Sequence, residues 1–422
     1  MRKVLLLPAL IFASAAWAQP ASDFGVVDLS FLIPPGDHAI RIADSTKGVP
    51  ILSQAVFNQF GDFINRGHSG IEHAYEKLIV TGFRFDPCGP VYPTDWDMAK
   101  CMLPNIRIIA QVYDNGQTST AALHMVFTLG VKLDQERALI QAGSGFDRTV
   151  REGVIQEMRL TKARNAAAGI VTAGIPVGVH PAFAAVNSAS ARSGAFLAEL
   201  EQLIRRVATE GSYFTTAVMF TENVAGSQPP GTERWVWQKG NVQRLAFPLG
   251  IRIVPGGIPG FEPSLKEQTL TASIDSRTGA EVVPKSNIEN NGVPNTMIAS
   301  IMKDSSELDW GQLQRAVDIA DTMDNPDRVL VQTDDCVSCH AATTARTYAL
   351  KDGRLGWVKR PSAFRFDAKA SSLAGSLTRE DAEWQSSPGY RMMSLAFFKG
   401  KPSVSQRVIN ETLQAARLLN RK

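Results

Sequence analysis

Residues 106–129 read IRIIAQVYDNGQTSTAALHMVFTL, and this stretch decides the class of fold. Residues 106–113 and 121–129 are rich in β-branched and aromatic side chains, and Asp114-Asn115-Gly116 between them is a strong turn signal. Two such runs joined by Asn-Gly predict a β-hairpin, because Asn and Gly tolerate the positive φ angles of a tight turn. We therefore expect an antiparallel sheet to be built around this hairpin.

Downstream of the hairpin, the pattern predicts one helix and then more strands. Apolar residues recur with helical spacing in 193–208, at Phe196, Leu200, Leu203, Ile204 and Val207. Residues 213–221, 234–238 and 242–254 have strand composition, and Lys239-Gly240-Asn241 predicts a tight turn between the last two. The fold class expected for this part is α+β, as a mixed, strand-rich domain.

The last third of the chain has a different composition. Residues 255–294 are rich in Gly, Pro, Asn and Ser without a sustained period, which is typical of a domain junction. Two helices are expected beyond it, one at 313–320 that Ser305 or Ser306 would cap, and one at the end of the chain, where Ser403 and Gln406 form a capping-box pattern. We therefore expect a domain at 19–260, a linker at 261–299 and a mainly α-helical domain at 300–422.

The N-terminus matches a secretory signal peptide at residues 1–18. Arg2 and Lys3 precede an apolar run that ends at Ala16-Trp17-Ala18, with cleavage expected after Ala18. A membrane-spanning helix, the alternative, needs roughly 20 apolar residues, and this run is shorter. The mature protein is therefore expected to be periplasmic or secreted, with no membrane span.

The charge of the mature chain gives no reason to expect a polyanionic partner. Of 44 basic residues, Arg2 and Lys3 leave with the signal peptide, so 42 face 41 acidic residues. A nearly neutral global charge offers no argument for binding to nucleic acid or to an anionic membrane surface. We therefore expect neither as a partner.

Cys336-Val337-Ser338-Cys339-His340 is the attachment pattern for c-type haem. In this pattern two thiols add to the haem vinyl groups, and the following imidazole is the proximal ligand of the iron. A zinc site is the first alternative, but no Cys or His follows His340 to complete it. A thioredoxin-like dithiol, the second, belongs between a strand and a helix, whereas Asp334-Asp335 precede Cys336. The sequence thus predicts one covalently bound haem c.

With this motif, residues 300–422 resemble a monohaem c-type cytochrome domain, and the full chain resembles exported proteobacterial monohaem proteins. The resemblance implies helices around the haem and a downstream methionine as the second axial ligand. Met392 and Met393 are the only methionines after His340, and either is a candidate for the distal ligand. Both could instead pack in a core, and a histidine from the other domain, with His180 nearest in sequence, remains an alternative ligand.

The two remaining cysteines, Cys88 and Cys101, flank a proline-rich stretch. In an exported protein such a pair predicts a disulfide, which would contribute about 3 kcal/mol by closing a short loop. Two free thiols are the alternative. A metal site is disfavoured, since no histidine lies between the two positions.

These features favour a periplasmic electron-transfer protein with a redox partner protein, in which the N-terminal domain docks or regulates. A haem enzyme of peroxidase or oxidase type is an alternative and would need an open iron site with a distal acid-base residue. A haem-based sensor of redox state or ligand is the third possibility. The N-terminal domain contains no Ser-His-Asp order, phosphate loop or metal cluster that would predict catalytic residues.

Overall fold

The computed structural model describes the chain in segments. They are residues 23–36, 38–54, 57, 74–89, 95–101, 103–130, 147–183, 191–210, 213–223, 233–244, 251–254, 267–275, 279–285, 309–326, 342, 395–398 and 401–421. The described residues contain both helices and antiparallel sheet, so the α+β class is confirmed. Most of the expected cytochrome-like domain, together with the expected signal peptide and the haem motif, lies outside the described residues.

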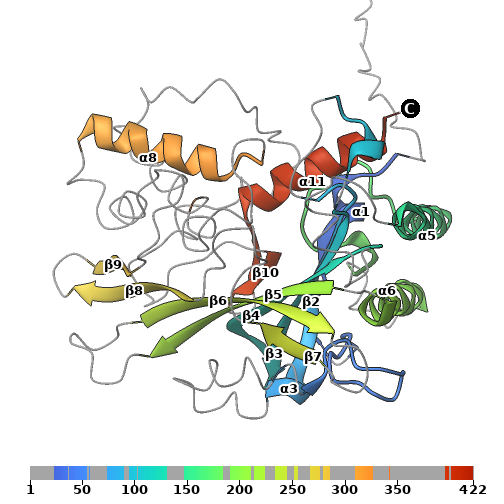
Figure 1. Cartoon of the computed structure of the whole chain (residues 1–422), viewed down its shortest axis with the longest axis horizontal. Helices are drawn as coiled ribbons and strands as arrows, with labels where there is room; N and C mark the ends of the chain where they lie inside the picture. Colours follow the sequence, from blue (N-terminus) through green and yellow to red (C-terminus); the bar gives the residue numbers. More distant parts are fainter. Residues whose placement is uncertain are drawn as a thin grey trace, which may run out of the picture.

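The centre of the fold is an antiparallel sheet in the order β1-β2-β3-β4-β5-β6-β8-β9, with β7 paired to β6 (Figure 1). Its strands are β1 Ser30–Leu32, β2 Leu78–Asp86, β3 Asn105–Asp114, β4 Gln117–Thr128, β5 Tyr213–Asn223, β6 Glu233–Arg244, β7 Ile251–Val254, β8 Glu267–Asp275 and β9 Gly279–Lys285. A separate hairpin consists of β10 Leu395–Phe398 and β11 Lys401–Val404. The helices are α1 Val26–Leu29, α3 Ala74–Lys77, α5 Arg148–Ala167, α6 Ala191–Glu210, α8 Trp310–Met323 and α11 Gln406–Leu419, with short 3-10 turns η1 Met98–Lys100 and η2 Pro181–Phe183.

The expected hairpin is confirmed as β3 and β4. Asp114 pairs with Gln117, so Asn115 and Gly116 form a two-residue turn. Their φ angles are 49° and 80°, the positive values that this kind of turn requires. The helix expected at 193–208 is also present, as α6, and its predicted apolar residues are buried.

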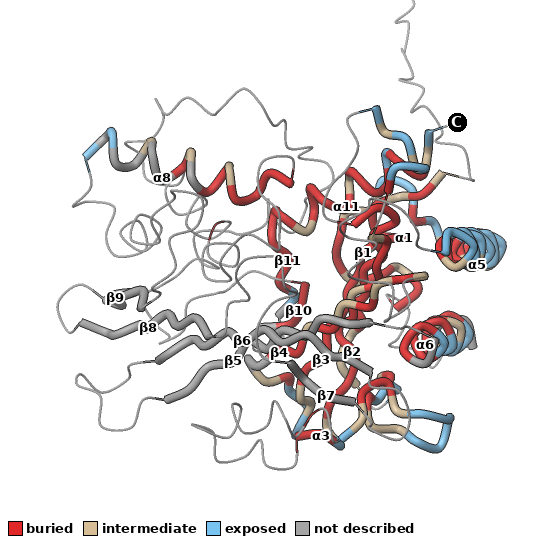
Figure 2. Tube along the Cα trace, viewed as in Figure 1, coloured by how far each residue is buried: buried red, intermediate tan, exposed pale blue. Residues whose placement is uncertain are grey.

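Strand β2 is buried along its whole length because both faces of this part of the sheet are covered (Figure 2). Phe83 faces α5 and α6, which lie side by side at one end of the molecule (Figure 1). Its neighbours Gly82 and Arg84 point the other way, toward β10 and α11 respectively. The result is a three-layer arrangement whose middle layer is β1 to β4.

Several segments differ from the expectations. The predicted turn at residues 239–241 is wrong, since these residues pair with β5 inside β6. Strands β8 and β9 lie within 261–299, where a linker was expected, and β8 pairs with β6. The final helix is present, but Ser405 caps it by accepting a hydrogen bond from the Val408 amide, while Ser403 belongs to β11.

The C-terminal helix is packed into the same core as the N-terminal strands. Ile409, Ala415 and Leu419 of α11 are buried with Phe24 and Leu29. The Asn420 side chain accepts a hydrogen bond from the Phe24 amide at 2.7 Å and donates one to the Phe24 carbonyl at 2.9 Å. The described ends of the chain, 396 residues apart in sequence, are thereby joined.

Candidate functional site

Of the predicted site residues, the structure describes the disulfide pair. Cys336, Cys339 and His340 lie outside the described residues, as do Met392 and Met393. Cys88 and Cys101 are bonded, with their Cα atoms 4.4 Å apart. Each cysteine is 1% exposed and packs near Leu418 of α11. The predicted disulfide is therefore confirmed, and the free-thiol alternative is excluded.

Replacement of both Cys88 and Cys101 by Ser is expected to lower the free energy of unfolding by about 3 kcal/mol. The bond closes a loop of sequence separation 13, so its loss returns conformational freedom to the unfolded chain. Urea unfolding of the parent and the double variant measures the difference. Reduction of the parent protein should produce a similar loss, and an unchanged midpoint under both conditions would contradict the expectation.

Side chains of α11 hold the end of α8, which is the last described element before the haem motif. The last turn of a helix leaves its carbonyl groups without partners inside the helix. Arg407 donates to the Met323 carbonyl at 2.9 Å, and Asn410 donates to the Asp324 carbonyl at 2.7 Å. These two contacts fix the end of α8 against α11.

Strand β10, the next described strand after the haem motif, also lies close to the start of α11. Leu395, the first residue of β10, pairs with Val404, the last residue of β11. Val404 precedes the helix cap Ser405. The described elements on either side of the haem motif, α8 and β10, are therefore both held next to the first turns of α11.

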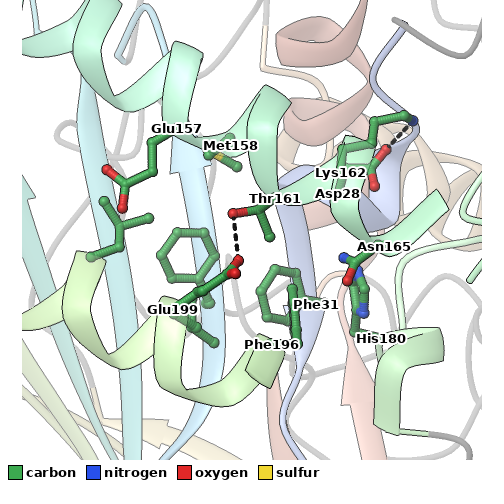
Figure 3. A pocket seen from close by; sticks show the side chains of 13 residues that line it. Asp28, Phe31, Glu157, Met158, Thr161, Lys162, Asn165, His180, Phe196 and Glu199 are labelled. Carbon is green, nitrogen blue, oxygen red and sulfur yellow. Dashed lines mark hydrogen bonds and ion pairs between the residues drawn. The ribbon is translucent and has the colours of Figure 1, made fainter. Parts of the chain in front are cut away.

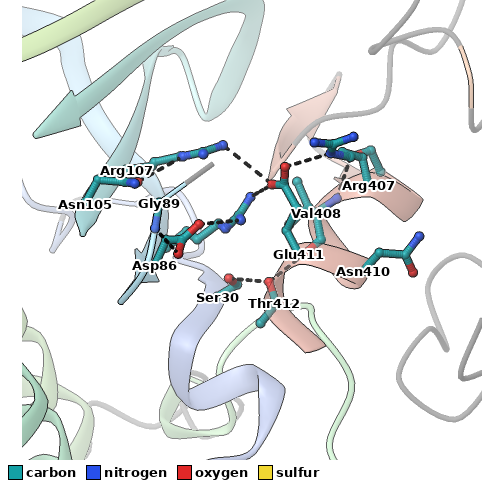
Figure 4. Close-up of polar contacts among 12 residues, drawn as sticks. Ser30, Asp86, Gly89, Asn105, Arg107, Arg407, Val408, Asn410, Glu411 and Thr412 are labelled. Carbon is teal, nitrogen blue, oxygen red and sulfur yellow. Dashed lines mark hydrogen bonds and ion pairs between the residues drawn. The ribbon is translucent and has the colours of Figure 1, made fainter. Parts of the chain in front are cut away.

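A group of buried charged residues lies between α11 and the sheet, and we call it the buried charge cluster. Glu411 contacts Arg84 of β2 and accepts a hydrogen bond from Nε of Arg407 at 2.7 Å (Figure 4). Arg107 of β3 lies 3.6 Å from the same carboxylate, and Asp86 lies 3.4 Å from Arg84. A carboxylate from the last helix is thus shared by guanidinium groups from three elements.

Burial and the neighbouring charges shift the pKa of the Glu411 carboxyl group in opposite directions. Desolvation alone would raise the pKa of its carboxyl group. The guanidinium groups of Arg84, Arg407 and Arg107 outweigh burial, so the pKa lies well below its usual value. Glu411 is therefore ionised in the folded protein at neutral pH, and it compensates part of the positive charge that the three arginines bring into the core.

A second polar site is a cavity of about 40 Å³ between α5, α6 and the edge of the sheet (Figure 3). Its apolar wall includes Phe31 and Phe196, and its polar groups include Lys162, which donates to Asp28 at 2.6 Å. The volume is enough for a few water molecules and much less than an engineered cavity that binds benzene, about 150 Å³. The geometry thus fits a hydrated cavity.

His180 lies on this cavity and is only 1% exposed. Its Nδ1 accepts a hydrogen bond from the Ala182 amide at 3.1 Å, so the proton of the neutral ring is on Nε2. The ring stacks on Phe196, with centroids 4.3 Å apart. Coordination of iron by His180 would require this core to open, which disfavours the histidine alternative for the sixth haem ligand.

The environment of His180 predicts a loss of stability in mild acid. Burial, followed by the charge of Lys162, lowers its pKa from 6.5 to about 3. The unfolded state therefore binds a proton at a pH where the folded state does not, so stability is complete above pH 6.5 and falls as the pH drops toward 3. We expect the protein to be about 2 kcal/mol less stable at pH 5 than at pH 7 from this residue.

Unfolding of a His180→Asn variant at the two pH values tests this expectation. The Asn side chain offers an oxygen near the position of Nδ1 to accept the Ala182 amide, but it does not titrate. The variant is expected to be less stable at pH 7 because the ring stacking is lost, and to lose much less stability on going to pH 5. Equal losses in the parent and the variant would refute the role of His180.

Comparisons of the chain with protein-family models, curated proteins and solved structures found no match. Among the side chains that the structure describes, no group of three or more His, Cys, Asp or Glu could hold a metal ion. A functional assignment therefore depends on the haem attachment pattern and on how the fold holds the segment that contains it.

Neither the buried charge cluster nor the cavity was predicted from the sequence. One signal for the cluster was present, because Arg84 stands inside LIVTGFRFD, an apolar run with strand composition. A charge in such a run predicts a buried ion pair. The partner could not be identified, since Glu411 is 327 residues away in sequence.

Proposed function

We propose that this protein is an exported electron carrier with one haem c bound covalently to Cys336 and Cys339. The proximal iron ligand is His340. The single observation that carries the proposal is the Cys336–His340 attachment pattern in a chain that begins with a signal-peptide pattern. The Cys88–Cys101 disulfide adds support, because structural disulfides persist in oxidising compartments such as the periplasm.

The haem-binding part of the chain, in this proposal, is the segment 327–394 rather than the whole of 300–422. Helices α8 and α11 flank that segment, and α11 packs into the core of the sheet. The proposed carrier thus has two parts. The described elements around the central sheet form one part, which we call the sheet body, and residues 327–394, the haem segment, are inserted between α8 and β10. The sheet body would orient the haem toward a redox partner protein.

No described helix is both long and apolar enough to cross a membrane. The proposed partner is another protein that exchanges single electrons with the haem. A nearly neutral mature chain gives such a partner little long-range electrostatic steering, so we expect association rates with weak dependence on ionic strength.

Mass spectrometry of protein made with a cytochrome maturation system tests the proposal. Purified protein should have the mass of the mature chain from Gln19 plus one haem. The ferric form should be low-spin, as in a six-coordinate carrier with little ligand rearrangement between oxidation states. A five-coordinate, high-spin haem would instead favour an enzyme of peroxidase or oxidase type. A mass without haem would exclude both the electron carrier and the haem enzyme.

The distal iron ligand is expected to be Met392 or Met393. A thioether ligand stabilises ferrous haem and raises the reduction potential, and these are the only methionines after His340. Ferric protein should then show the weak long-wavelength sulfur-to-iron absorption band. One of Met392→Ala and Met393→Ala should abolish that band while the other, its matched control, preserves it. Persistence of the band in both variants would exclude each as the unique ligand.

A further inference from the structure

Strand β10 lies against the sheet at a point where the sequence has a glycine. A Cβ atom on Gly82 would lie 2.6 Å from the Leu395 carbonyl oxygen and 3.3 Å from the Ile109 side chain. Contacts of 2.6 Å to a backbone oxygen do not occur for real Cβ atoms, so any larger residue would displace β10. Gly82 therefore permits the close approach that seats the first residue of β10.

A buried glutamine holds the next part of β10. The Gln111 side chain donates to the Phe397 carbonyl at 2.6 Å and accepts from the Phe397 amide at 2.8 Å, as a neighbouring strand would. It also donates to the Ser119 carbonyl at 3.0 Å and accepts from the Thr81 hydroxyl at 2.9 Å. Both donor hydrogens and both acceptor sites of the amide are thus used.

This arrangement fixes Gln111 in one orientation. The side chain is 1% exposed, and a buried amide that loses its partners carries the full cost of desolvation. Any other rotamer would leave the amide and the Phe397 backbone groups without these partners. Leu395 and Phe397 are consequently held in a defined position relative to β2 and β3.

The residues just before β10 are those expected to complete the iron coordination. Met393 lies two residues before Leu395 in the sequence, and Met392 lies three residues before it. Consecutive Cα atoms are 3.80 Å apart, so a shift of Leu395 is passed on to both methionines within a short length of chain.

We infer that Gly82 and Gln111 are positioning residues for the methionine that binds the haem iron. They act through β10, by holding the chain where it leaves the haem segment, and they do not touch the iron. This inference rests on the proposed function. Its structural basis is independent of the haem motif, because Gly82 and Gln111 belong to the sheet body.

Gly82→Ala and Gln111→Leu, made in the holoprotein, test the inference. In ferric protein we would measure the sulfur-to-iron band and the imidazole concentration that displaces half of the native ligand. Both variants should weaken the band and lower that concentration about tenfold, which corresponds to about 1.4 kcal/mol, the scale of one net hydrogen bond. Thr81→Val removes the hydroxyl that donates to the Gln111 amide oxygen at 2.9 Å, together with its longer contact to the Ile109 carbonyl at 3.5 Å, and it provides a milder variant if Gln111→Leu does not fold.

Two controls separate positioning from general loss of stability. Gly153→Ala makes the same change on the exposed face of α5, where nothing lies within 4 Å of the added atom. Leu203→Ala removes a buried side chain of α6 and should destabilise the fold by about 2–5 kcal/mol. Both controls should keep the parental band, with imidazole displacement within about twofold of the parent, since additive effects at separate sites do not change ligand exchange.

The outcomes distinguish this inference from the proposed function. If the parent shows the band and the Gly82 and Gln111 variants match the controls, the positioning role is wrong and the carrier stands. If the parent holds haem without the band, methionine ligation and the positioning role both fail. A parent without haem overturns the proposed function, and the inference with it.

Discussion

Replacement of Glu411 by Gln is expected to lower the free energy of unfolding by about 3–5 kcal/mol. The carboxylate contacts Arg84, which is 2% exposed, and Arg407, which is 3% exposed. Gln keeps the size of the side chain but removes its charge, so two buried guanidinium groups lose the anion that offsets their desolvation. The Gln amide also presents donor hydrogens to groups that can only donate.

Urea unfolding at neutral pH measures this loss. Asp95→Asn is the control, because it makes the same carboxylate-to-amide change in the pair with Lys100, where both side chains are exposed, 50% for Asp95 and 58% for Lys100. An exposed pair contributes little to the free energy of unfolding, so the control should stay close to the parent. A Glu411→Gln variant as stable as the control would mean that other groups neutralise the buried charge cluster.

Replacement of both Cys336 and Cys339 by Ser is expected to abolish covalent haem attachment completely. The two thiols form the only bonds from the protein to the haem periphery in the attachment pattern, so haem held by His340 alone should be released by acid extraction in denaturant. Each single variant should retain one thioether bond. The measurement is the mass of the denatured protein together with the haem found in the extract.

The matched control for this variant is the double change of Cys88 and Cys101 to Ser. It removes the same number of sulfur atoms, but those atoms form the disulfide and face the core near Leu418. That variant should keep one haem per chain despite its lower stability. Haem loss from the control, or covalent haem in the Cys336/Cys339 double variant, would overturn the assignment of the four cysteines.

The parts of the fold that could be predicted from the sequence have a local cause. The β3–β4 hairpin followed from Asn115-Gly116, where the turn requires positive φ at both residues. Helix α6 followed from a 3.6-residue period, because one apolar face is enough to identify a helix that packs on a core. The disulfide followed from the compartment that the first 18 residues predict.

The rest depends on contacts that no local pattern contains. Residues 267–275 and 279–285 have the composition of a junction, yet pairing with β6 makes them strands. Lys239-Gly240-Asn241 has turn chemistry, yet the register of β5 keeps it extended. The Arg84–Glu411 pair and the Gln111 contacts to Phe397 join residues 327 and 286 positions apart, so only the assembled fold identifies the partners.

The hydrogen bonds between Phe24 and Asn420 affect when a newly synthesised chain can fold. Synthesis begins at the amino terminus, and α11 is made late. The central core cannot be complete before then, because α11 supplies buried residues to it. Contacts between the two extremes of a sequence raise the contact order, and high contact order slows folding. The newly made chain is thus expected to complete its central core only after α11 has been synthesised.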